Sequence, residues 1–290
     1  MPQFLFLTCE NVLVNLKPIL KYAEQNNCAI GAFNVPNIAS ILAVIESAEV
    51  LKVPVILMHA QVHENLVPID IIGGAMICAA KKANIPVCVH LDHGEDLDYL
   101  KKALDLGFTS IMYDGSNKNY EENVIFTRRA VELANQYNAT VEGEIGIMAS
   151  NLPVKEKTGI YTNPNQAIAF AKETKIDAMA CSFGTIHGIY LDKPKIDYSI
   201  NEKIREKVNI PIVMHGGSGV LPEQYKLCIE KGIRKINYYT YMSKAGGEVI
   251  ANRVLNNMNS EIHYYHDFVL IGKQAMKENV LEAMKIFYNL

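Results

Sequence analysis

Short, nearly continuous apolar runs alternate along this chain with longer segments in which apolar residues recur three and four positions apart. The short runs lie at 29–35, 53–60, 85–92, 108–114, 139–146, 176–184, 210–217 and 233–240. Segments of the second kind include 38–52, 123–138 and 165–175. A short apolar run predicts a buried strand, whereas the period of three to four residues predicts an amphipathic helix. The chain is therefore expected to repeat a strand–helix unit.

The number and character of these units predict the fold. Strands that are apolar on both faces are typical of a parallel sheet covered by helices. Eight such units close naturally into a barrel, so we predict an α/β fold of the (β/α)8 TIM barrel type, with an extra C-terminal helix within 266–290. An open, doubly wound sheet is the competing topology, but no GxGxxG motif follows the first run. No linker divides the chain, so residues 1–290 are expected to form a single domain.

Composition narrows the classes of function. The chain has 290 residues, 49% of them apolar, which is enough for one large core. A formal net charge of -3 gives no basic surface for nucleic acid, and no apolar stretch reaches the roughly 18 to 20 residues that span a bilayer. The N-terminal segment lacks the features of a signal peptide, so a cytoplasmic protein is expected. Six scattered cysteines without a CxxC pair fit a reducing compartment and suggest no thiol nucleophile.

Three histidines carry the most informative chemistry. His93, His187 and His215 each precede a glycine, and each follows a predicted strand. Imidazole is a favoured zinc ligand, and three protein ligands with an open fourth position are typical of a catalytic site. Asp92 immediately precedes His93, which places a carboxylate beside the expected cation. These residues predict a metal-assisted proton-transfer site.

The barrel prediction gives a reason for such residues to meet, because barrel active sites lie at the carboxyl ends of the strands. The polar residues near the predicted ends are Asn34, Asp92, His93, Asp114, Glu144, His187, His215 and Asn237. His90 alternates with Leu91 and is expected to be a buried, hydrogen-bonded histidine. The remaining histidines, His59, His63, His263 and His266, are interpreted as surface or packing residues.

Several short motifs occur in order along the chain. They are GAFNV at 31–35, HLDHG at 90–94, GFTSIMYDGS at 107–116, VEGEIG at 141–146, GTIHG at 184–188, MHGGSG at 214–219 and KIN at 235–237, followed by Thr240. With them the chain resembles, over nearly its full length, the class II metal-dependent ketose-bisphosphate aldolases. This group includes the fructose-1,6-bisphosphate and tagatose-1,6-bisphosphate aldolases.

The resemblance implies a role for each matching residue. The catalytic divalent cation, usually zinc, with Co2+ or another divalent cation as alternatives, would be bound by His93, His187 and His215. Asp92 would exchange a proton with the C4 hydroxyl of the ketose, and Asn34 would contact the substrate. The phosphate of dihydroxyacetone phosphate, with a monovalent cation (Na+ or K+) nearby, would be bound by Gly188, Gly216, Gly217, Ser218, Asn237, Tyr238, Tyr239 and Thr240. Asp114 and Glu144 would lie near a secondary cation.

The implied reaction is the reversible cleavage of a ketose 1,6-bisphosphate to dihydroxyacetone phosphate and an aldehyde such as glyceraldehyde 3-phosphate. Fructose 1,6-bisphosphate is the first candidate substrate, and tagatose 1,6-bisphosphate or a related phosphorylated ketose is the next. Cleavage leaves an enediolate whose charge requires a Lewis acid, and a base must take the C4 proton. A Schiff-base lysine is the metal-free alternative, but Lys235 is the only lysine within a predicted strand.

The chain departs from the family pattern at two places. In the segment 147–157, where many members carry an acidic mobile loop, Asn151 and Leu152 replace the expected acidic pair. Glu156 is the nearby carboxylate, and the base for the C3 proton is left unassigned. Tyr241 stands where an acidic residue is expected after the threonine. No arginine is assigned to a second phosphate.

Two other functions stay open at this point. One is a non-catalytic barrel subunit that stabilises an aldolase partner, although such a subunit has no reason to keep Asp92 and the three histidines. The other is a metal-dependent isomerase or epimerase acting on a phosphorylated sugar. The segment 266–290 has more apolar surface than one barrel face needs, which suggests a homodimer or homotetramer. The expected ligand is a small phosphorylated sugar, with neither nucleic acid nor membrane as a partner.

Overall fold

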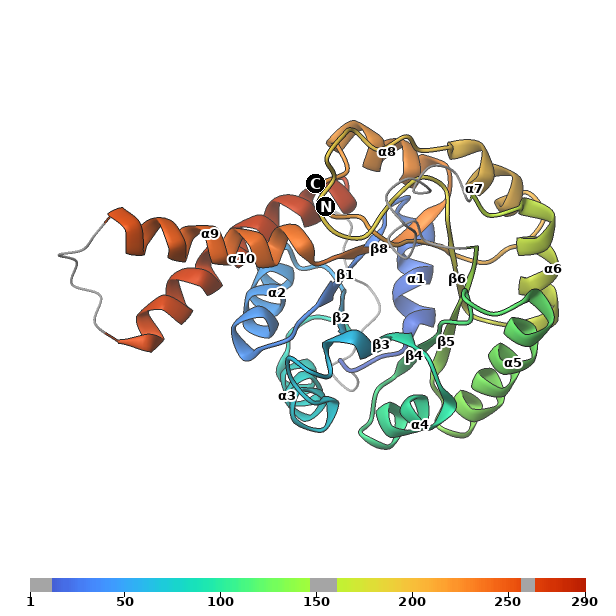
Figure 1. Cartoon of the computed structure of the whole chain (residues 1–290), viewed down its shortest axis with the longest axis horizontal. Coiled ribbons are helices and arrows are strands. Elements are labelled where there is room, and N and C mark those ends of the chain that lie inside the picture. The colour runs from blue at the N-terminus through green and yellow to red at the C-terminus, as the bar shows by residue number, and fades with distance from the viewer. Residues whose placement is uncertain (1–11, 147–160, 257–263) are drawn as a thin grey trace.

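Eight parallel strands form a closed barrel in this structure, which is a computed structural model of the chain (Figure 1). The structure describes residues 12–146, 161–256 and 264–290. The strands are β1 (Ile30–Asn34), β2 (Val55–Ala60), β3 (Val87–Gly94), β4 (Ser110–Tyr113), β5 (Thr140–Ile145), β6 (Ala178–Cys181), β7 (Ile212–Met214) and β8 (Ile233–Tyr238). Each strand pairs with the next one along the chain, and β8 pairs with β1. The predicted (β/α)8 barrel is confirmed.

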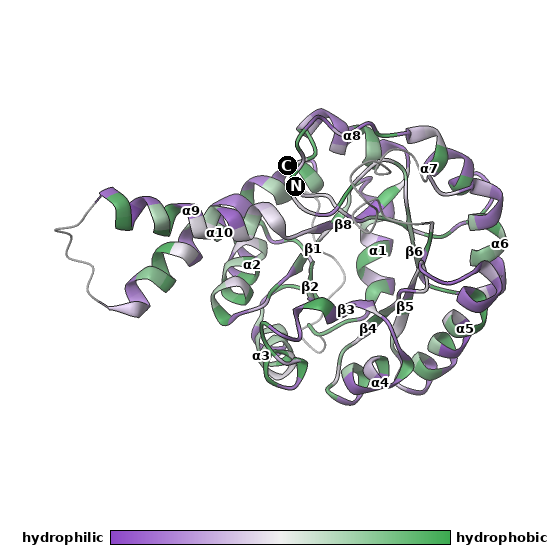
Figure 2. Cartoon of the chain, in the orientation of Figure 1, coloured by the Kyte–Doolittle hydropathy of each residue, from purple (hydrophilic) through white to green (hydrophobic). Residues whose placement is uncertain are grey.

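Helices alternate with the strands and surround the barrel (Figure 1). They are α1 (Leu16–Gln25), α2 (Ile38–Leu51), the short 3-10 helix η1 (Gln61–His63), α3 (Ile69–Lys82), α4 (Leu97–Asp105), α5 (Tyr120–Gln136), α6 (Pro164–Thr174), α7 (Tyr198–Arg205), α8 (Pro222–Glu230), α9 (Thr240–Asn256) and α10 (Tyr265–Phe287). Figure 2 shows hydrophilic and hydrophobic residues alternating along the turns of these helices, as expected of helices with one face on the barrel.

The sequence marks where many of these helices begin. The side chains of Asn37, Asp96, Asn119, Asn163 and Asp197 accept backbone N–H groups in the first turns of α2, α4, α5, α6 and α7. Asparagine and aspartate are favoured at this position because the first four N–H groups of a helix have no partner within it. The ends of β1, β3 and β4 therefore lead through short loops into capped helices.

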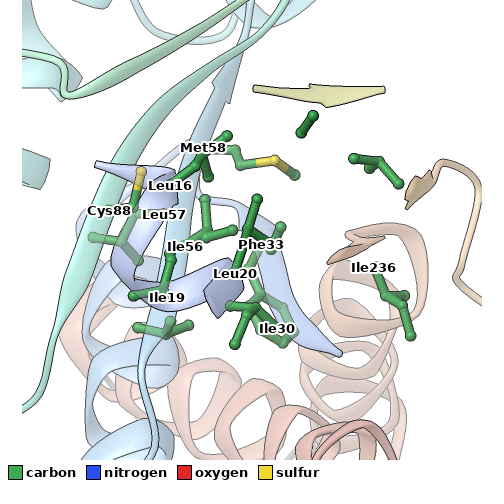
Figure 3. Close-up of a cluster of buried hydrophobic side chains, with 14 of the residues drawn as sticks. Leu16, Ile19, Leu20, Ile30, Phe33, Ile56, Leu57, Met58, Cys88 and Ile236 are labelled. Atoms are coloured by element: carbon green, nitrogen blue, oxygen red, sulfur yellow. The ribbon is translucent and has the colours of Figure 1, made fainter. Parts of the chain in front are cut away.

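Helix α1 precedes the barrel and lies at the amino ends of the strands. Its apolar face, formed by Leu16, Ile19, Leu20 and Ala23, is buried. The backbone N–H of Leu16 donates to the hydroxyl of Thr140, the first residue of β5. Figure 3 shows three of these side chains, Leu16, Ile19 and Leu20, among residues of β1, β2 and β3. This helix, which was not predicted from the sequence, closes the end of the barrel formed by the amino ends of the strands.

Helix α10 is the predicted extra C-terminal helix. It packs against α2, α8, α9 and β1, and so it covers the part of the barrel wall between α8 and α2. Helices α9 and α10 extend together away from the barrel, as Figure 1 shows. Leu255 and Tyr265 are exposed in this part. Among the described residues, no helix combines the length and the apolar character that a membrane crossing requires.

Candidate active site

A pocket of about 360 Å³ opens at the carboxyl end of the barrel. It is lined by Asn34, Ala60, Val62, His63, Asp92, His93, Glu95, Asp114, Glu144, His187, Gly188, Gly216, Ser218, Asn237, Tyr238, Tyr239 and Thr240. Of the residues predicted to form the site, Gly217 and His215 are the two that are absent from this lining, and His215 is fully buried just behind it. Segments from all eight strand ends thus converge, as the barrel prediction requires.

Three imidazole rings lie together at the bottom of this pocket. Ring centroids are 4.6 Å apart for His93 and His215, 5.1 Å for His93 and His187, and 5.8 Å for His187 and His215. One ring nitrogen from each histidine lies within 4.8 Å of the others. His93 has a positive φ of 49° at an irregularity in the pairing of β3 with β4, which turns its ring out of the strand. His187 lies in the loop after β6 rather than at the strand end that the sequence predicted.

Carboxylates orient two of these rings. Nδ1 of His93 is 2.6 Å from Oδ2 of Asp114, and Nε2 of His215 is 2.9 Å from Oε1 of Glu142. The other ring nitrogens, Nε2 of His93 and Nδ1 of His215, are buried and have no hydrogen-bond partner among the described residues. A carboxylate on one nitrogen of an imidazole is the usual support for a metal on the other. The donor set therefore fits a divalent cation.

The charges around the rings also favour a cation. Burial lowers the pKa of His93, but Asp92, the hydrogen bond to Asp114 and the charge of Glu144 outweigh it and raise the pKa to about 10. Burial and the neighbouring His93 and His215 lower the pKa of His187 to about 3. Burial, followed by the charge of Asp114, raises the pKa of Glu144 well above its ordinary value. The same carboxylates that hold a proton on His93 would attract a metal ion to its Nε2.

Asp92 lies beside the rings and is held by two amides. Its Oδ2 accepts from Nδ2 of Asn34 at 2.9 Å, and its Oδ1 accepts from Nδ2 of Asn237 at 3.1 Å. Burial disfavours the charged form, but the charges of His93, His215 and Lys235 and the hydrogen bond from Asn34 outweigh it, so that the pKa of Asp92 is well below its ordinary value. Asp92 is therefore an ionised, oriented acceptor at the pocket wall.

Glycines bring two loops into close contact on the opposite side. Gly216 has a φ of 62°, and a Cβ atom there would lie 2.3 Å from the carbonyl oxygen of Ile186. The hydroxyl of the partly buried Tyr190 joins the same loops, because it donates to the Gly216 carbonyl at 2.8 Å and accepts from the Ile186 N–H at 2.9 Å. Ser218 Oγ accepts from the N–H of Tyr239 at 3.1 Å. This loop cluster contains the residues predicted to bind phosphate.

Comparison with known proteins decides the family. Residues 14–289 match the family of class-II fructose-bisphosphate aldolases. This chain belongs to that family. The sulfofructosephosphate aldolase of Alkalicoccus urumqiensis is 35% identical over 274 residues, which cover 93% of this chain and 95% of that protein. The resemblance noted in the sequence is thus confirmed.

Two further relatives of this aldolase support the same family assignment. The 6-phospho-5-dehydro-2-deoxy-D-gluconate aldolase of Halalkalibacterium halodurans is 32% identical over 283 residues, covering 95% of this chain and 96% of the relative. The crystal structure of the YdjI aldolase from Escherichia coli K12 superimposes with a TM-score of 0.84 at 28% identity, covering 95% of this chain and 97% of that one.

A buried ionic cluster beneath the pocket of this aldolase was not predicted. Nζ of Lys235 is 2.8 Å from Oε2 of Glu142 and 2.8 Å from Oδ1 of Asn237. Lys235 thus fixes the amide of Asn237 so that its nitrogen faces Asp92, while Glu142 accepts from His215. The signal in the sequence was the presence of charged residues inside apolar strand runs. His90, predicted to be buried and hydrogen-bonded, lies 2.8 Å from the Ser110 hydroxyl.

His63 was interpreted as a surface or packing residue; it does pack against another side chain, but its place in the pocket was not predicted. It ends η1 and lines the pocket, where its ring lies 4.9 Å from that of Tyr239. His59 is a buried packing residue, with Nε2 3.1 Å from the Tyr99 hydroxyl, and His266 is exposed, as predicted. The predictions for His263 and for the segment 147–157, with Asn151, Leu152 and Glu156, lie outside the described residues.

Proposed function

We propose that this class II aldolase reversibly cleaves a phosphorylated ketose between C3 and C4 to give dihydroxyacetone phosphate and an aldehyde. One observation carries the proposal: ring nitrogens of His93, His187 and His215 lie within 4.8 Å of one another, beside the ionised Asp92. A non-catalytic barrel subunit has no use for such an arrangement. An isomerase or epimerase would share it, so only the products distinguish that alternative.

The three histidines would bind a divalent cation, with zinc as the first candidate because imidazole nitrogen suits it. When bound, the cation supplies a Lewis acid for the negative charge that cleavage leaves on the donor fragment. Asp114 and Glu142 would keep two of the imidazoles in the required tautomer. Oε2 of Glu144 lies 3.8 Å from Nδ1 of His93 and 3.6 Å from Nδ1 of His215. Glu144 and Asp114 would together offer carboxylate oxygens to a secondary cation.

Asp92 would take the proton of the C4 hydroxyl during cleavage and return it during condensation. The amides of Asn34 and Asn237 each donate to one carboxylate oxygen, so the side chain cannot rotate without losing a hydrogen bond. A base held in this way needs no reorganisation at the moment of reaction. Removing its charge should therefore reduce the rate without removing the metal ligands.

The phosphate of the donor would bind the loop cluster opposite Asp92. Gly188 and the run Gly216, Gly217 and Ser218 would offer backbone N–H groups, with the segment 237–240 beside them and a monovalent cation nearby. A Cβ atom at Gly217 would lie 2.7 Å from the carbonyl oxygen of Asn237, so the close approach of these two loops requires glycine. The cradle is thus shaped by the backbone.

The nature of the second half of the ketose is less constrained. Fructose 1,6-bisphosphate and tagatose 1,6-bisphosphate both need a partner for a second phosphate, and the pocket lining contains no lysine or arginine in the part of the chain that the structure describes. The names of the two relatives specify substrates with one phosphate and a second acid group that is not a phosphate. This second group is a sulfo group for the relative from Alkalicoccus urumqiensis and a gluconate carboxylate for the relative from Halalkalibacterium halodurans. Two substrate classes therefore compete.

Proton exchange of dihydroxyacetone phosphate in deuterated water, followed by NMR, tests the proposed function without any aldehyde. We expect exchange with the metal-loaded enzyme and its loss after chelation, with recovery on addition of zinc or cobalt. Absence of exchange under all conditions would favour the non-catalytic subunit. Exchange accompanied by conversion of a ketose phosphate to an aldose, without cleavage, would favour an isomerase.

The oligomeric state is part of the same proposal. We expect a homodimer or homotetramer whose contacts involve α10, because Tyr265 and Leu270 are exposed on this helix. Solution scattering of the full chain measures the mass directly, and a monomer at micromolar concentration would contradict the expectation.

A further inference from the structure

Two sides of the pocket have different chemistry. The loops proposed to bind phosphate follow β6, β7 and β8, whereas Asp92 lies near the end of β3. If the donor phosphate and the C4 hydroxyl occupy these places, as the proposed function requires, the rest of the ketose extends toward the loops after β2 and β3. We call this part of the lining the aldehyde side; it consists of Ala60, Val62, His63 and Glu95.

The aldehyde side is poorly suited to a second phosphate. No lysine or arginine belongs to it among the described residues, and Glu95 contributes a carboxylate. A phosphate dianion placed there would lose hydration and face a like charge without a compensating cation. Ala60 and Val62 offer only apolar contacts. The one neutral group on this side that can donate a hydrogen bond from its side chain is therefore the imidazole of His63.

His63 is held in place by its surroundings. Its carbonyl oxygen accepts from the N–H of Leu66 at 2.8 Å and from that of Val67 at 3.0 Å, which fixes the turn after η1. Its ring lies against that of Tyr239 at 4.9 Å. The neighbouring Gln61 side chain accepts from the N–H of Glu95 at 2.8 Å, which ties η1 to the loop after β3. The imidazole is thus a positioned group and not a mobile surface side chain.

The ring of His63 also has an unused hydrogen-bonding atom. Its Nδ1 is buried and finds no hydrogen-bond partner within the described ranges. Burial lowers the pKa of His63, with the charge of Asp92 opposing. A neutral imidazole keeps one N–H donor, which can serve an acid oxygen. A dianion loses more hydration on entering the pocket than a group with one negative charge, so a single hydrogen bond offsets a larger share of the cost for the monoanion.

We infer that His63 is the specificity-determining residue for the aldehyde half of the substrate, where its imidazole binds a terminal monoanionic acid, either a carboxylate or a sulfonate. The inference rests on the proposed function and names the substrate class for the same pocket. It also accounts for the two relatives, whose names specify such acids on a phosphorylated substrate. Glyceraldehyde 3-phosphate, the aldehyde first expected from the sequence, becomes a poorer acceptor.

The test is condensation with dihydroxyacetone phosphate, using the metal-loaded enzyme and one of four aldehydes. They are 3-oxopropanoate, which has a carboxylate, 2-hydroxy-3-sulfopropanal, which has a sulfonate, glyceraldehyde 3-phosphate and the neutral glyceraldehyde. We expect kcat/KM for one of the two monoanionic acids to exceed that for glyceraldehyde 3-phosphate by about 10-fold or more. The acid that leads distinguishes carboxylate from sulfonate. A lead by glyceraldehyde 3-phosphate would overturn the inference.

Variants then assign the preference to this side chain. The ratio of kcat/KM for the leading acid to that for glyceraldehyde should fall roughly 10-fold to 100-fold in His63→Ala, because a hydrogen bond to a charged group is lost. His63→Gln keeps an N–H donor and should retain part of the ratio. His266→Ala removes an exposed imidazole on α10 and should leave the ratio within about 2-fold. An unchanged ratio in both His63 variants would overturn the assignment.

The failure of this inference and the failure of the proposed function give different results. Proton exchange of dihydroxyacetone phosphate needs no aldehyde and reports the donor side alone. Exchange by the wild-type enzyme without preference for either acid would remove the role of His63 and leave the aldolase intact. Absence of exchange would remove the proposed function itself.

Discussion

The ionic cluster beneath the pocket predicts a large effect on stability. Lys235 and Glu142 are fully buried, and Nζ of Lys235 is 2.8 Å from one oxygen of Glu142. Lys235→Met keeps a side chain of similar length but removes the charge and its hydrogen bonds. Among the residues that the structure describes, Glu142 then keeps its contacts with His90 and His215. A buried carboxylate that loses its cation costs about 3 to 5 kcal/mol of folding free energy.

This cost can be converted to a melting temperature. An unfolding entropy of about 2.1 cal/mol/K per residue gives about 0.6 kcal/mol/K for a chain of 290 residues. The expected decrease in Tm for Lys235→Met is therefore about 5 to 8 °C. Differential scanning calorimetry should be performed with a chelator on both proteins, so that a change in metal affinity does not contribute.

Two further variants make this prediction specific. Lys101 Nζ is 2.7 Å from Oδ2 of Asp105, a similar distance, but both side chains are about half exposed, at 54% and 50%. Lys101→Met should therefore leave Tm within about 1 °C. The double variant Lys235→Met with Glu142→Gln removes both charges and should recover about half of the lost stability. The prediction is refuted if Lys235→Met has the same Tm as the wild type, or if the Tm of the double variant is no higher than that of Lys235→Met.

Three other outcomes are expected. Tyr190→Phe leaves the Gly216 carbonyl without its donor and should raise KM for dihydroxyacetone phosphate roughly 5-fold to 10-fold at similar kcat; an unchanged KM in the exchange assay would contradict this. Asp92→Asn should retain the divalent cation while kcat for cleavage falls at least about 100-fold, whereas His187→Ala should lose both the cation and the activity. Metal analysis of the dialysed proteins and a cleavage assay measure these two effects. Burial lowers the pKa of His90 to about 3. Between about pH 6.5 and 3 the unfolded chain therefore binds a proton at this residue that the folded chain does not, and the free energy of unfolding decreases as the pH is lowered. From pH 6.5 to 5 this single group costs about 2 kcal/mol, or about 3 °C, and His90→Gln measured with chelator should show a decline smaller by that amount.

The sequence predicted the fold because its strongest signal was repetitive. Each apolar run contained a strand, and eight parallel strands have one natural closure. The same closure explains why Asn34 and Asn237, far apart in the chain, both donate to Asp92. The cluster of three histidines was predictable for a second reason. A histidine beside glycine at the end of an apolar run conflicts with strand propensity and packing, and such conflicts mark functional positions.

The parts that were missed depend on geometry that periodicity does not encode. His63 looks like an ordinary polar residue in sequence, because its position over the pocket depends on the turn of η1 and on contact with Tyr239. Tyr190 reads as a loop aromatic, although its hydroxyl joins two loops of the site. Lys235 was visible as a lysine inside a strand, but its partner Glu142 could be identified only from the register of the closed barrel.

The two sides of the pocket differ in how easily they can change, and this bears on substrate choice. On the donor side, a side chain at Gly216 or Gly217 would collide with backbone atoms at 2.3 Å and 2.7 Å, so the shape depends on the backbone itself. The aldehyde side is built from side chains on η1 and on the loop after β3, where replacing His63 or Glu95 requires no movement of a strand. If the proposed roles hold, substitution there would change the recognised acid at little cost to the fold, whereas substitution in the donor loops would disturb the phosphate site. We therefore expect dihydroxyacetone phosphate to be the fixed product of this scaffold, and the aldehyde to be the product that a few side chains determine.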